Sequence, residues 1–358
     1  MSLVQKRVQE HLVAQFQALV AASGASLERT RPQHAGQPAT PQTRRIEVER
    51  VVLVTRQTAL EELLVRFGTR GQARFYLTHA GDDFGAIEAA HERYHGALRA
   101  VREQLPRRLK VQVVERALLA QYQFAPTDLA LALGPDGLVV NVAKYLDGQP
   151  IVGVNPDPAR IEGVLLRVAL RDAGKVVQAA AAGEVRTRAV TMAEAATSDG
   201  QRLLAFNDLF VGAKTHVSAR YRLRVGRASE AQSSSGIIVS TGAGSTGWLR
   251  SVLAGAAGVA RARGVRMQED VRAARMPWGA PYLTYAVREP FPSTTTGANL
   301  VMGQVTHAQP LVVESHMATG GVVFSDGMEA DFLRFDRGAT VTIRPAAQQA
   351  HLVVGERT

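Results

Sequence analysis

The pattern of apolar and polar positions changes near position 161 of this 358-residue chain. Before that point, short apolar runs alternate with segments whose apolar residues recur every three or four positions, the spacing of an amphipathic helix. This alternation favours a parallel sheet with helices on both faces. Beyond it, strand-like runs follow one another with little helical signal. The pattern therefore predicts an α/β domain followed by a β-rich, mostly antiparallel domain.

The segment at 4–22 has helical spacing, and the Pro-, Gly- and polar-rich segment that follows is typical of a linker or a mobile loop. Together they form an N-terminal region at 1–44, and the α/β domain spans 45–160. A further helix is expected after the turn at 134–137. The other expected elements of this domain are strands at 46–55, 73–78, 109–114, 129–133 and 151–154, and helices at 60–67 and 84–104.

The β-rich domain is expected over 161–358, with its clearest helix at 247–263. Its last strand is a candidate to return to the first domain. The strands expected from β-branched and apolar runs lie at 164–170, 185–192, 202–206, 216–225, 237–240, 282–287, 309–314, 321–324 and 340–343.

The composition is that of a globular protein, with 46% hydrophobic and 21% charged residues. No apolar run is long enough to cross a membrane, and Lys6, Arg7 and Glu10 exclude a secretory signal. We therefore expect a cytoplasmic protein with no membrane partner. The absence of cysteine excludes disulfides, thiolate metal sites and cysteine nucleophiles.

The chain is basic, with a net charge of +10 that comes almost entirely from arginine. These arginines are spread out, with no dense basic run and no interleaved aromatic residues, which makes nucleic acid an unlikely partner. Their field can still draw in polyphosphate ligands. The histidines His216, His307 and His316 lack metal-ligand spacing, so no metal site is predicted, and Glu61-Glu62 is interpreted as a pair of solvated helix-end charges.

One stretch combines a buried strand, a tight turn and a helix. The uncharged run at 129–133 stops at Gly134-Pro135-Asp136-Gly137, after which apolar residues recur at helical spacing. In an open α/β sheet, ligands bind beyond the carboxyl ends of the strands, where backbone N–H groups at a helix N-terminus attract phosphate. Asp136 would stand beside such a ligand. The alternative is an ordinary βα turn, in which Gly, Pro and Asp are all common.

A second stretch joins an apolar strand to a helix through a loop rich in glycine and hydroxyl groups. The strand at 237–240 leads into Thr241-Gly242-Ala243-Gly244-Ser245-Thr246-Gly247. Such a loop can offer backbone N–H groups and hydroxyls to phosphates, although the lysine of a P-loop is absent. The alternative is a plain loop. Two shorter signals are Asn155 after the strand at 151–154, and the pair Asn207-Asp208 ahead of another strand.

Together, and in this order, these stretches resemble the ATP-dependent NAD kinase family. That family carries Gly-Gly-Asp-Gly-Thr after a strand, then Gly-Val-Asn, then an Asn-Glu pair. A strand followed by Thr-Pro-Thr-Gly-Ser-Thr-Ala-Tyr comes next, and a Ser-Asp-Gly turn comes late. The resemblance covers roughly 46–354, and its motifs match residues 134–138, 153–155, 207–208, 241–248 and 325–327.

The resemblance implies a role for each matching residue. Asp136 matches the catalytic carboxylate, which lies at the ribose hydroxyl that becomes phosphorylated. The positions that match the binding of NAD are Asn207, Asp208, Thr246, Gly247 and Trp248. Those that match the phosphate- and nucleotide-binding turns are Gly134, Gly137, Asn155, Gly242, Gly244 and Ser245. The implied fold is an α/β domain with a β-rich second domain, and the implied assembly is a homo-oligomer, a dimer or a tetramer.

The implied reaction moves a phosphoryl group from ATP, with Mg²⁺, to the adenosine ribose 2′-hydroxyl of NAD, giving NADP. The chain departs from the family at Pro135 for glycine, Leu138 for threonine, Ser235 for a frequent aspartate and Trp248 for tyrosine. Two alternatives stay open. One is a kinase of the same superfamily that acts on a lipid or sugar hydroxyl, and the other is a non-catalytic nucleotide-binding relative.

Overall fold

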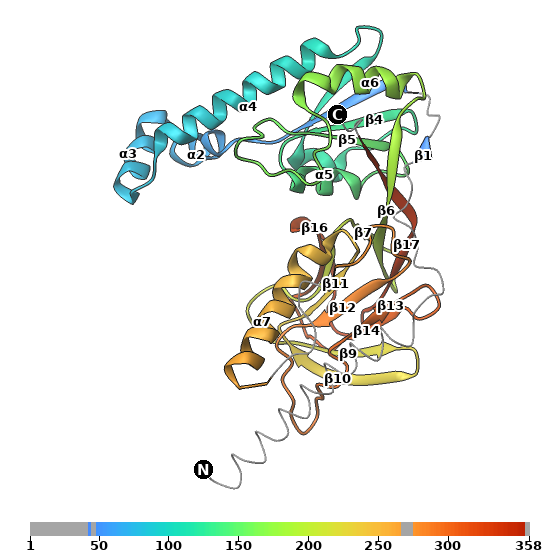
Figure 1. The fold of residues 1–358 in the computed structure, drawn as a ribbon. Helices are drawn as coiled ribbons and strands as arrows, with labels where there is room; N and C mark the ends of the chain where they lie inside the picture. The colour runs from blue at the N-terminus through green and yellow to red at the C-terminus, as the bar shows by residue number, and fades with distance from the viewer. Residues whose placement is uncertain (1–41, 44–47, 266–274, 355–358) are drawn as a thin grey trace. The chain divides into compact units, whose positions relative to one another are not determined.

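The computed structural model describes residues 42–43, 48–265 and 275–354, and these form two compact units (Figure 1). Of the described residues, the α/β unit comprises 42–43, 48–189 and 350–354, and the β-rich unit comprises 190–265 and 275–349. The predicted helix at 4–22 and almost all of the predicted linker lie outside the described residues. The exception is β1 (Gln42–Thr43), which pairs antiparallel with β6 (Arg186–Thr197).

The sheet of the α/β unit is parallel, as the alternation of strands and helices predicts. Its order is β3 (Lys110–Glu115), β2 (Arg50–Thr55), β4 (Asp128–Leu133) and β5 (Pro150–Val154). The end of β17 (Thr340–Val353) adds a further parallel strand beside β5, through His351 and Leu352. The last strand of the chain therefore returns to this unit.

Helices cover both faces of this sheet. Because successive side chains of a strand point to opposite faces, Val51 and Leu53 lie in the layer with α4 (Phe84–Gln104) and α6 (Ala173–Ala181). On the other face lies α5 (Asp136–Ala143), which packs on β4 and β5. The 3₁₀ segment η1 (Arg116–Gln121) contacts α5. These layers match the predicted α/β domain.

The strand predicted at 73–78 is wrong, because these residues lie inside α3 (Arg70–Ala80). The Thr69 hydroxyl caps this helix by accepting from the Gln72 N–H, and Gly81 ends it in the left-handed region at a φ of 82°. Ala73 and Leu77, one turn apart, are its buried residues. The apolar positions thus follow helical spacing. The preceding helix α2 (Ala59–Phe67) lies where it was predicted.

The strand predicted at 164–170 is also wrong. The structure has only an isolated bridge there, between Val154 and Val168, followed by η2 (Leu170–Asp172) and the unpredicted helix α6. A physical reason is that the backbone N–H groups of Val164 and Leu165 donate to a carboxylate instead of a neighbouring strand.

The β-rich unit contains two packed layers of strands, which are mostly antiparallel as predicted. The first layer has β10 (Ala228–Ser234), β9 (Ala219–Val225), β14 (Leu311–Ser315) and the first part of β17, with β6 and β7 (Arg202–Ala205) beside it. The second layer, in order, is β13 (Met302–Val305), β12 (Leu283–Val287), β11 (Ile237–Ser240), β8 (Asp208–Ala213), β15 (Gly321–Ser325) and β16 (Met328–Arg334).

The core of this unit lies between the two layers. Leu209, Val211 and Val239 from the second layer pack with residues such as Leu223 and Ile343 from the first. The predicted helix after the Gly-rich loop is α7 (Trp248–Ala262), preceded by the 3₁₀ turn η3 (Gly244–Thr246). It packs on β11, and its Leu249 contacts Ala286 of β12. The outer face of the second layer is therefore partly covered by α7.

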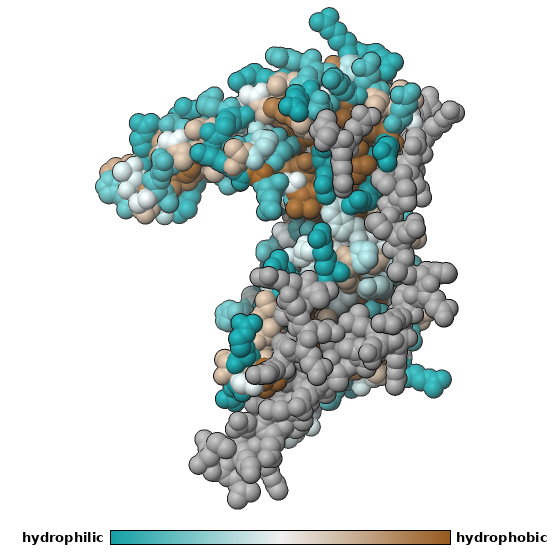
Figure 2. All heavy atoms as spheres, in the orientation of Figure 1, coloured by the Kyte–Doolittle hydropathy of each residue, from teal (hydrophilic) through white to brown (hydrophobic). Residues whose placement is uncertain are grey.

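Among the described residues, no helix has the length and apolar character needed to cross a membrane. The longest of these helices, α4, presents mainly hydrophilic residues on the face seen in Figure 2.

Candidate functional site

The turn at 134–137 lies at the carboxyl end of β4, as predicted. It leads directly into α5, which has no side-chain cap. The Leu138 N–H donates to the Pro135 carbonyl at 2.9 Å, so the N–H groups of Asp136 and Gly137 are the ones that can bind a ligand. Gly134 is buried, and a side chain there would crowd Leu138, whereas Gly137 is exposed and a side chain there would meet open space. The open part of the turn is therefore at Gly137.

Asp136, the predicted catalytic residue, is half-buried and hydrogen-bonded to the loop after β5. Its Oδ2 accepts from the Val164 N–H at 2.8 Å, and its Oδ1 accepts from the Leu165 N–H at 2.8 Å. The carboxylate thus holds this loop next to the turn. Both of its oxygens are engaged, but each retains a lone pair that can accept a further hydrogen bond.

Asn155 shapes the same loop. Its Oδ1 accepts from the Asp157 N–H at 2.9 Å, and its Nδ2 donates to the Ile161 carbonyl at 2.8 Å. The Asp157 carboxylate in turn pairs with Arg93 of α4 at 2.8 Å. The structure therefore gives Asn155 a defined role in folding the loop. Its predicted contact with nucleotide stays a prediction.

In the β-rich unit, the pair Asn207-Asp208 is fixed by Asp326, which is 118 residues from Asp208 in the sequence. The Asp326 carboxylate accepts from the backbone N–H groups of Phe206 and Asn207, each at 2.8 Å, and of Asp208 at 3.1 Å. The Asp326 N–H returns a bond to the Asp208 carbonyl at 3.0 Å. A single carboxylate therefore sets the path of the predicted NAD-binding segment.

Asp326 can do this because it lies in a tight two-residue turn. Asp326 and Gly327 both have positive φ, 53° and 67°, and they join β15 to β16 where Ser325 pairs with Met328. Two positive φ angles are typical of the hairpin turn for which Asp-Gly is a strong signal. Ser325-Asp326-Gly327, the match to the family's late Ser-Asp-Gly motif, therefore forms a turn.

The Gly-rich loop is packed against Asn207. The Thr241 N–H donates to the Asn207 carbonyl at 2.9 Å, and the Thr241 hydroxyl donates to the Phe206 carbonyl at 2.6 Å. A side chain at Gly244 would collide with the Asn207 backbone, and one at Gly242 would collide with the Pro277 carbonyl. Close backbone packing therefore requires glycine at both positions.

The predicted residues of this loop divide by exposure. Ser245 is buried, and its hydroxyl donates to the Gly242 carbonyl and accepts from the Met276 N–H. Thr246 and Gly247 are exposed, and Trp248 is half-buried. The outward-facing end of the loop at 246–248 is thus the part that can reach a ligand. The phosphate-binding roles predicted for Gly242, Gly244 and Ser245 remain predictions.

Trp248 belongs to an aromatic cluster on the outer face of the second layer. Its ring is stacked 5.7 Å from that of Phe210, which lies 4.8 Å from that of Phe324. The Arg288 guanidinium lies 5.4 Å from the centre of the Trp248 ring. Trp248 and Arg288 also line a cavity of about 600 Å³ beside α7, with Met302. Flat aromatic faces and a cation suit a planar, negatively charged ligand.

Asp208 has an unusual environment for a carboxyl group. It is buried, and its Oδ1 has no hydrogen-bond partner among the described residues. Burial, opposed by the hydrogen bond of Ser240 and assisted by the negative charge of Asp326, raises the pKa of Asp208 to about 7. At neutral pH this carboxyl is therefore protonated in part of the molecules, where it can donate a hydrogen bond.

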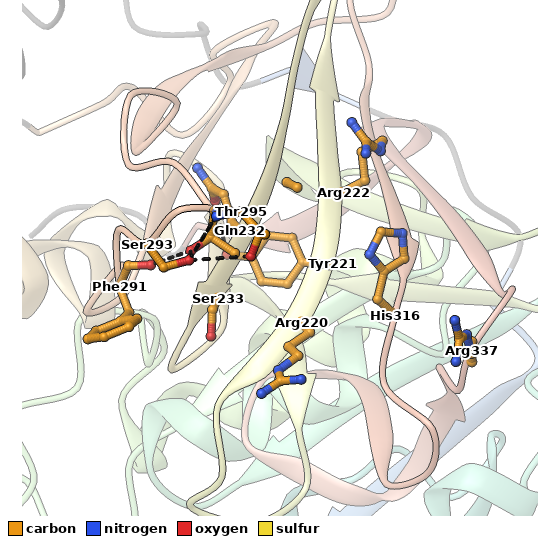
Figure 3. Close-up of a pocket in the computed structure, with 12 residues that line it drawn as sticks. Arg220, Tyr221, Arg222, Gln232, Ser233, Phe291, Ser293, Thr295, His316 and Arg337 are labelled. Atoms are coloured by element: carbon orange, nitrogen blue, oxygen red, sulfur yellow. Dashed lines mark hydrogen bonds between the residues drawn. The ribbon is translucent and has the colours of Figure 1, made fainter.

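A second cavity of about 600 Å³ in the β-rich unit was not predicted from the sequence. Arg220 and Arg222 from β9, with His316 and Arg337, contribute positive or ionisable groups to it (Figure 3). Hydroxyl-bearing residues near Ser293 line it as well. The available signal was the spacing of arginines at every second position of β9, which places them on one face of the strand.

Sequence reasoning also missed the pair His91 and His95, which lie four residues apart in α4. Their spacing is the signal that could have drawn attention to them, because residues four apart share a helix face. Glu61 and Glu62 lie in the first turn of α2, as their interpretation as helix-end charges states, and Glu62 is exposed. Glu61 differs from that interpretation because it is half-buried and its carboxylate contacts both His95 and Thr58.

The predicted residues thus form two groups. Asp136, the turn glycines and Asn155 lie together in the α/β unit, while Asn207, Asp208 and the loop at 241–248 lie together in the β-rich unit.

No family model and no curated protein matches this sequence. Among solved structures, the chain is similar to yeast NADH kinase in complex with NADH, with 13% identity and a TM-score of 0.52 over 88% of each chain. It also matches an NAD kinase from Archaeoglobus fulgidus in complex with ATP, with 18% identity and a TM-score of 0.47 over 86% of this chain and 94% of that one. The likeness to the yeast structure shows that the chain has a NAD kinase-like two-domain fold, an α/β domain with a β-rich second domain.

Proposed function

We propose that this protein is a phosphotransferase that moves a phosphoryl group from ATP to the adenosine ribose 2′-hydroxyl of NAD, giving NADP. The observation that carries the proposal is that Asp326 fixes the Asn207-Asp208 segment and that the loop ending at Trp248 is hydrogen-bonded to this segment. The fold shared with yeast NADH kinase supports the same class of reaction.

In the β-rich unit, we assign the recognition of NAD to groups that remain available. Asn207 offers an amide that can both donate and accept hydrogen bonds, which suits a nucleoside edge or a ribose hydroxyl. Asp208 offers a neutral carboxyl as a donor near pH 7. Trp248 offers a ring face for stacking, and Thr246 and Gly247 offer exposed groups beside it.

In the α/β unit, we assign to Asp136 the role of binding the reacting ribose hydroxyl. Phosphoryl transfer needs positioning and charge stabilisation more than covalent chemistry. The Val164 and Leu165 N–H groups hold the Asp136 carboxylate in place, and a remaining lone pair can accept the hydroxyl hydrogen. Gly134 and Gly137 flank the uncapped start of α5, where N–H groups can bind phosphate.

The Mg²⁺ that accompanies ATP supplies charge neutralisation on the phosphates when it is bound. Each Asp136 oxygen accepts one N–H bond, and the proposal uses a remaining lone pair for the reacting hydroxyl. We therefore assign no residue of the chain to Mg²⁺.

The deciding experiment is NADP formation from NAD, ATP and Mg²⁺ by the purified full-length protein. Parallel reactions with NADH in place of NAD, and with polyphosphate in place of ATP, identify the acceptor and the donor. Formation of NADP or NADPH supports the proposal. No product with any pair of substrates, together with phosphorylation of a lipid or sugar, would assign the protein to another branch of the superfamily.

A second candidate function is nucleotide binding without catalysis. It is favoured by the double engagement of Asp136 and by Pro135, which cannot donate a backbone hydrogen bond. Leu138, where the family has a hydroxyl, is buried. This candidate predicts that NAD raises the melting temperature while ATP with Mg²⁺ does not. If the protein is a phosphotransferase, we expect both NAD and ATP with Mg²⁺ to raise the melting temperature.

A further inference from the structure

Three side chains with metal-binding atoms meet between two helices of the α/β unit. Glu61 comes from α2, and His91 and His95 come from α4. One ligand atom from each lies within 4.8 Å of the others. The His95 Nε2 is 3.0 Å from the Glu61 Oε1, and the two imidazole rings are 4.3 Å apart. All three residues are half-buried.

The local sequence explains why these groups face one another. His91 and His95 are one turn apart, so both imidazoles lie on the face of α4 that packs against α2. Thr58 and Glu61 form a capping box at the start of α2, in which the Thr58 N–H donates to the Glu61 Oε2 at 2.7 Å. This bond orients the other carboxylate oxygen, Oε1, towards the histidines.

The Glu61 carboxylate also suits a cation, because carboxylate oxygens only accept hydrogen bonds. The backbone N–H and the hydroxyl of Thr58 both donate to its Oε2, at 2.7 Å and 3.0 Å. The Thr58 hydroxyl, 2.8 Å from the His91 Nδ1, supplies an outer partner that orients this imidazole.

We propose that Glu61, His91 and His95 bind one divalent ion of the zinc class, joining α2 to α4. Two imidazoles and one carboxylate are typical zinc ligands, whereas Mg²⁺ and Ca²⁺ take oxygen ligands. Ligand atoms around a tetrahedral zinc ion are about 3.3 Å apart, given zinc–ligand bonds of about 2.0–2.1 Å. The Glu61–His95 distance is already close to this, and the His91 ligand atom, within 4.8 Å of the other two, has to move closer for an ion to bind. A fourth position stays open to water.

The alternative explanation is that these residues form only a capping box and a histidine–carboxylate hydrogen bond. Both explanations account for the helix packing, but only the proposed site binds a metal ion. The distinction does not depend on the phosphotransferase proposal, because the readout is binding of the metal itself.

The test is titration of the purified, metal-free full chain with Co²⁺, followed by its visible absorption, and then competition with Zn²⁺. We expect one Co²⁺ per chain, displaced by Zn²⁺, and a higher melting temperature with Zn²⁺. His91→Gln and His95→Gln each remove a metal ligand. Loss of an outer partner lowers metal affinity by roughly 10–100-fold, and we expect each of these two variants to lose more Co²⁺ affinity than that. Thr58→Val removes only an outer partner, so its loss of Co²⁺ affinity should lie within that range.

The matched control is His79→Gln, because His79 is an exposed histidine on neighbouring α3 whose Nδ1 contacts the Phe75 carbonyl outside the cluster. It should bind Co²⁺ like the unaltered protein. Glu61→Gln provides a further variant if a histidine variant fails to fold, since its amide oxygen can keep the bond from Thr58 while the charge is lost. No binding by the unaltered protein, or equal binding by the cluster variants and the control, would overturn the proposal.

Discussion

Two carboxylates, Asp136 and Asp326, have the same kind of environment at the residue scale. Each accepts backbone N–H groups from a segment remote in sequence, two in the case of Asp136 and three in the case of Asp326. Asp208 differs, since it is buried with an unpartnered oxygen and a pKa of about 7. The first two are fixed acceptors of backbone N–H groups, and the third changes its protonation state near neutral pH.

Replacing Asp136 separates its two possible roles. In Asp136→Asn the amide cannot accept from both N–H groups, so we expect a loss of about 1–3 kcal/mol in the free energy of unfolding. If the residue also acts on the ribose hydroxyl, turnover should fall about 10²–10⁴-fold. The measurements are denaturant unfolding and kcat for NADP formation.

The control for this prediction is Asp157→Asn, which loosens the same loop by removing its ion pair with Arg93. It should lower stability without a comparable loss of turnover. If Asp136→Asn and Asp157→Asn reduced kcat equally, Asp136 would be a loop residue and not a catalytic one.

The raised pKa of Asp208 predicts a pH-dependent stability. Between about pH 4 and pH 7 the folded carboxyl keeps a proton that the unfolded chain has released, so the free energy of unfolding falls as the pH rises. The full contribution is at most about 4 kcal/mol. Asp208→Asn should remove this slope, as urea unfolding at a series of pH values will measure.

Asp199→Asn is the matched control for Asp208→Asn. Asp199 is exposed, and hydrogen bonds from Thr197 and Gln201 lower its pKa, so its own contribution has the opposite sign and lies at lower pH. An unchanged slope in Asp208→Asn would show that other groups cause the pH dependence.

At the scale of elements, the sequence pattern located most helices and strands but did not assign them all correctly. The limits of β11 were predicted at Ile237 and Ser240, where the structure has them, because a continuous apolar run of that length fits a buried strand. The strand predicted at 73–78 was wrong because the consecutive aromatic residues Phe75 and Tyr76, which are common in strands, hid the one-turn spacing of Ala73 and Leu77. The strand predicted at 164–170 was wrong because the N–H groups of Val164 and Leu165 donate to the Asp136 carboxylate and not to a neighbouring strand.

The candidate site was predictable only in part for the same reason. The motifs named Asn207, Asp208 and Trp248, and the structure brings their segments together. The sequence could not show that Asp326 fixes this segment, because the contact spans 118 residues and depends on the order of β8 and β15 in the sheet. Nor could it show that Ser245 is buried, since exposure depends on packing against Met276.

The turn between β15 and β16 offers a prediction at this scale. Asp326→Asn keeps a residue that tolerates positive φ, so the hairpin should remain, while the three N–H groups lose a charged acceptor. We expect a loss of about 1–3 kcal/mol in the free energy of unfolding and weaker NAD binding by the folded protein. Calorimetric titration with NAD and urea unfolding provide the measurements. Unchanged NAD affinity would mean that the Asn207-Asp208 segment does not bind NAD.

At the scale of the whole molecule, the chain builds its two units in an interleaved order. Along the described chain, residues up to Ala189 belong to the α/β unit, Val190 to Gln349 belong to the β-rich unit, and the residues from Ala350 belong again to the α/β unit. β17 is one continuous strand that pairs with β14 near its start and with β5 near its end. The stability of the α/β unit therefore depends on residues at the far end of the sequence.

This arrangement predicts that a small C-terminal deletion has a large effect. Ending the chain at Gln349 removes Leu352 and Val353, both fully buried, and exposes the edge of β5 that pairs with His351 and Leu352. Each of the two buried side chains contributes about 1.5–3 kcal/mol, so the loss is a sizeable part of a typical stability of about 5–15 kcal/mol.

Limited proteolysis and hydrogen exchange of chains 1–349 and 1–354 will test this prediction. In the 1–349 chain, we expect faster cleavage and exchange within β4 and β5, because their sheet has lost its parallel neighbour. The 1–354 chain is the matched control, since it keeps every described residue of β17. Equal protection of β5 in both chains would mean that the returning end of β17 contributes little, and that the α/β sheet is stabilised by its other strands and by α4, α5 and α6 alone.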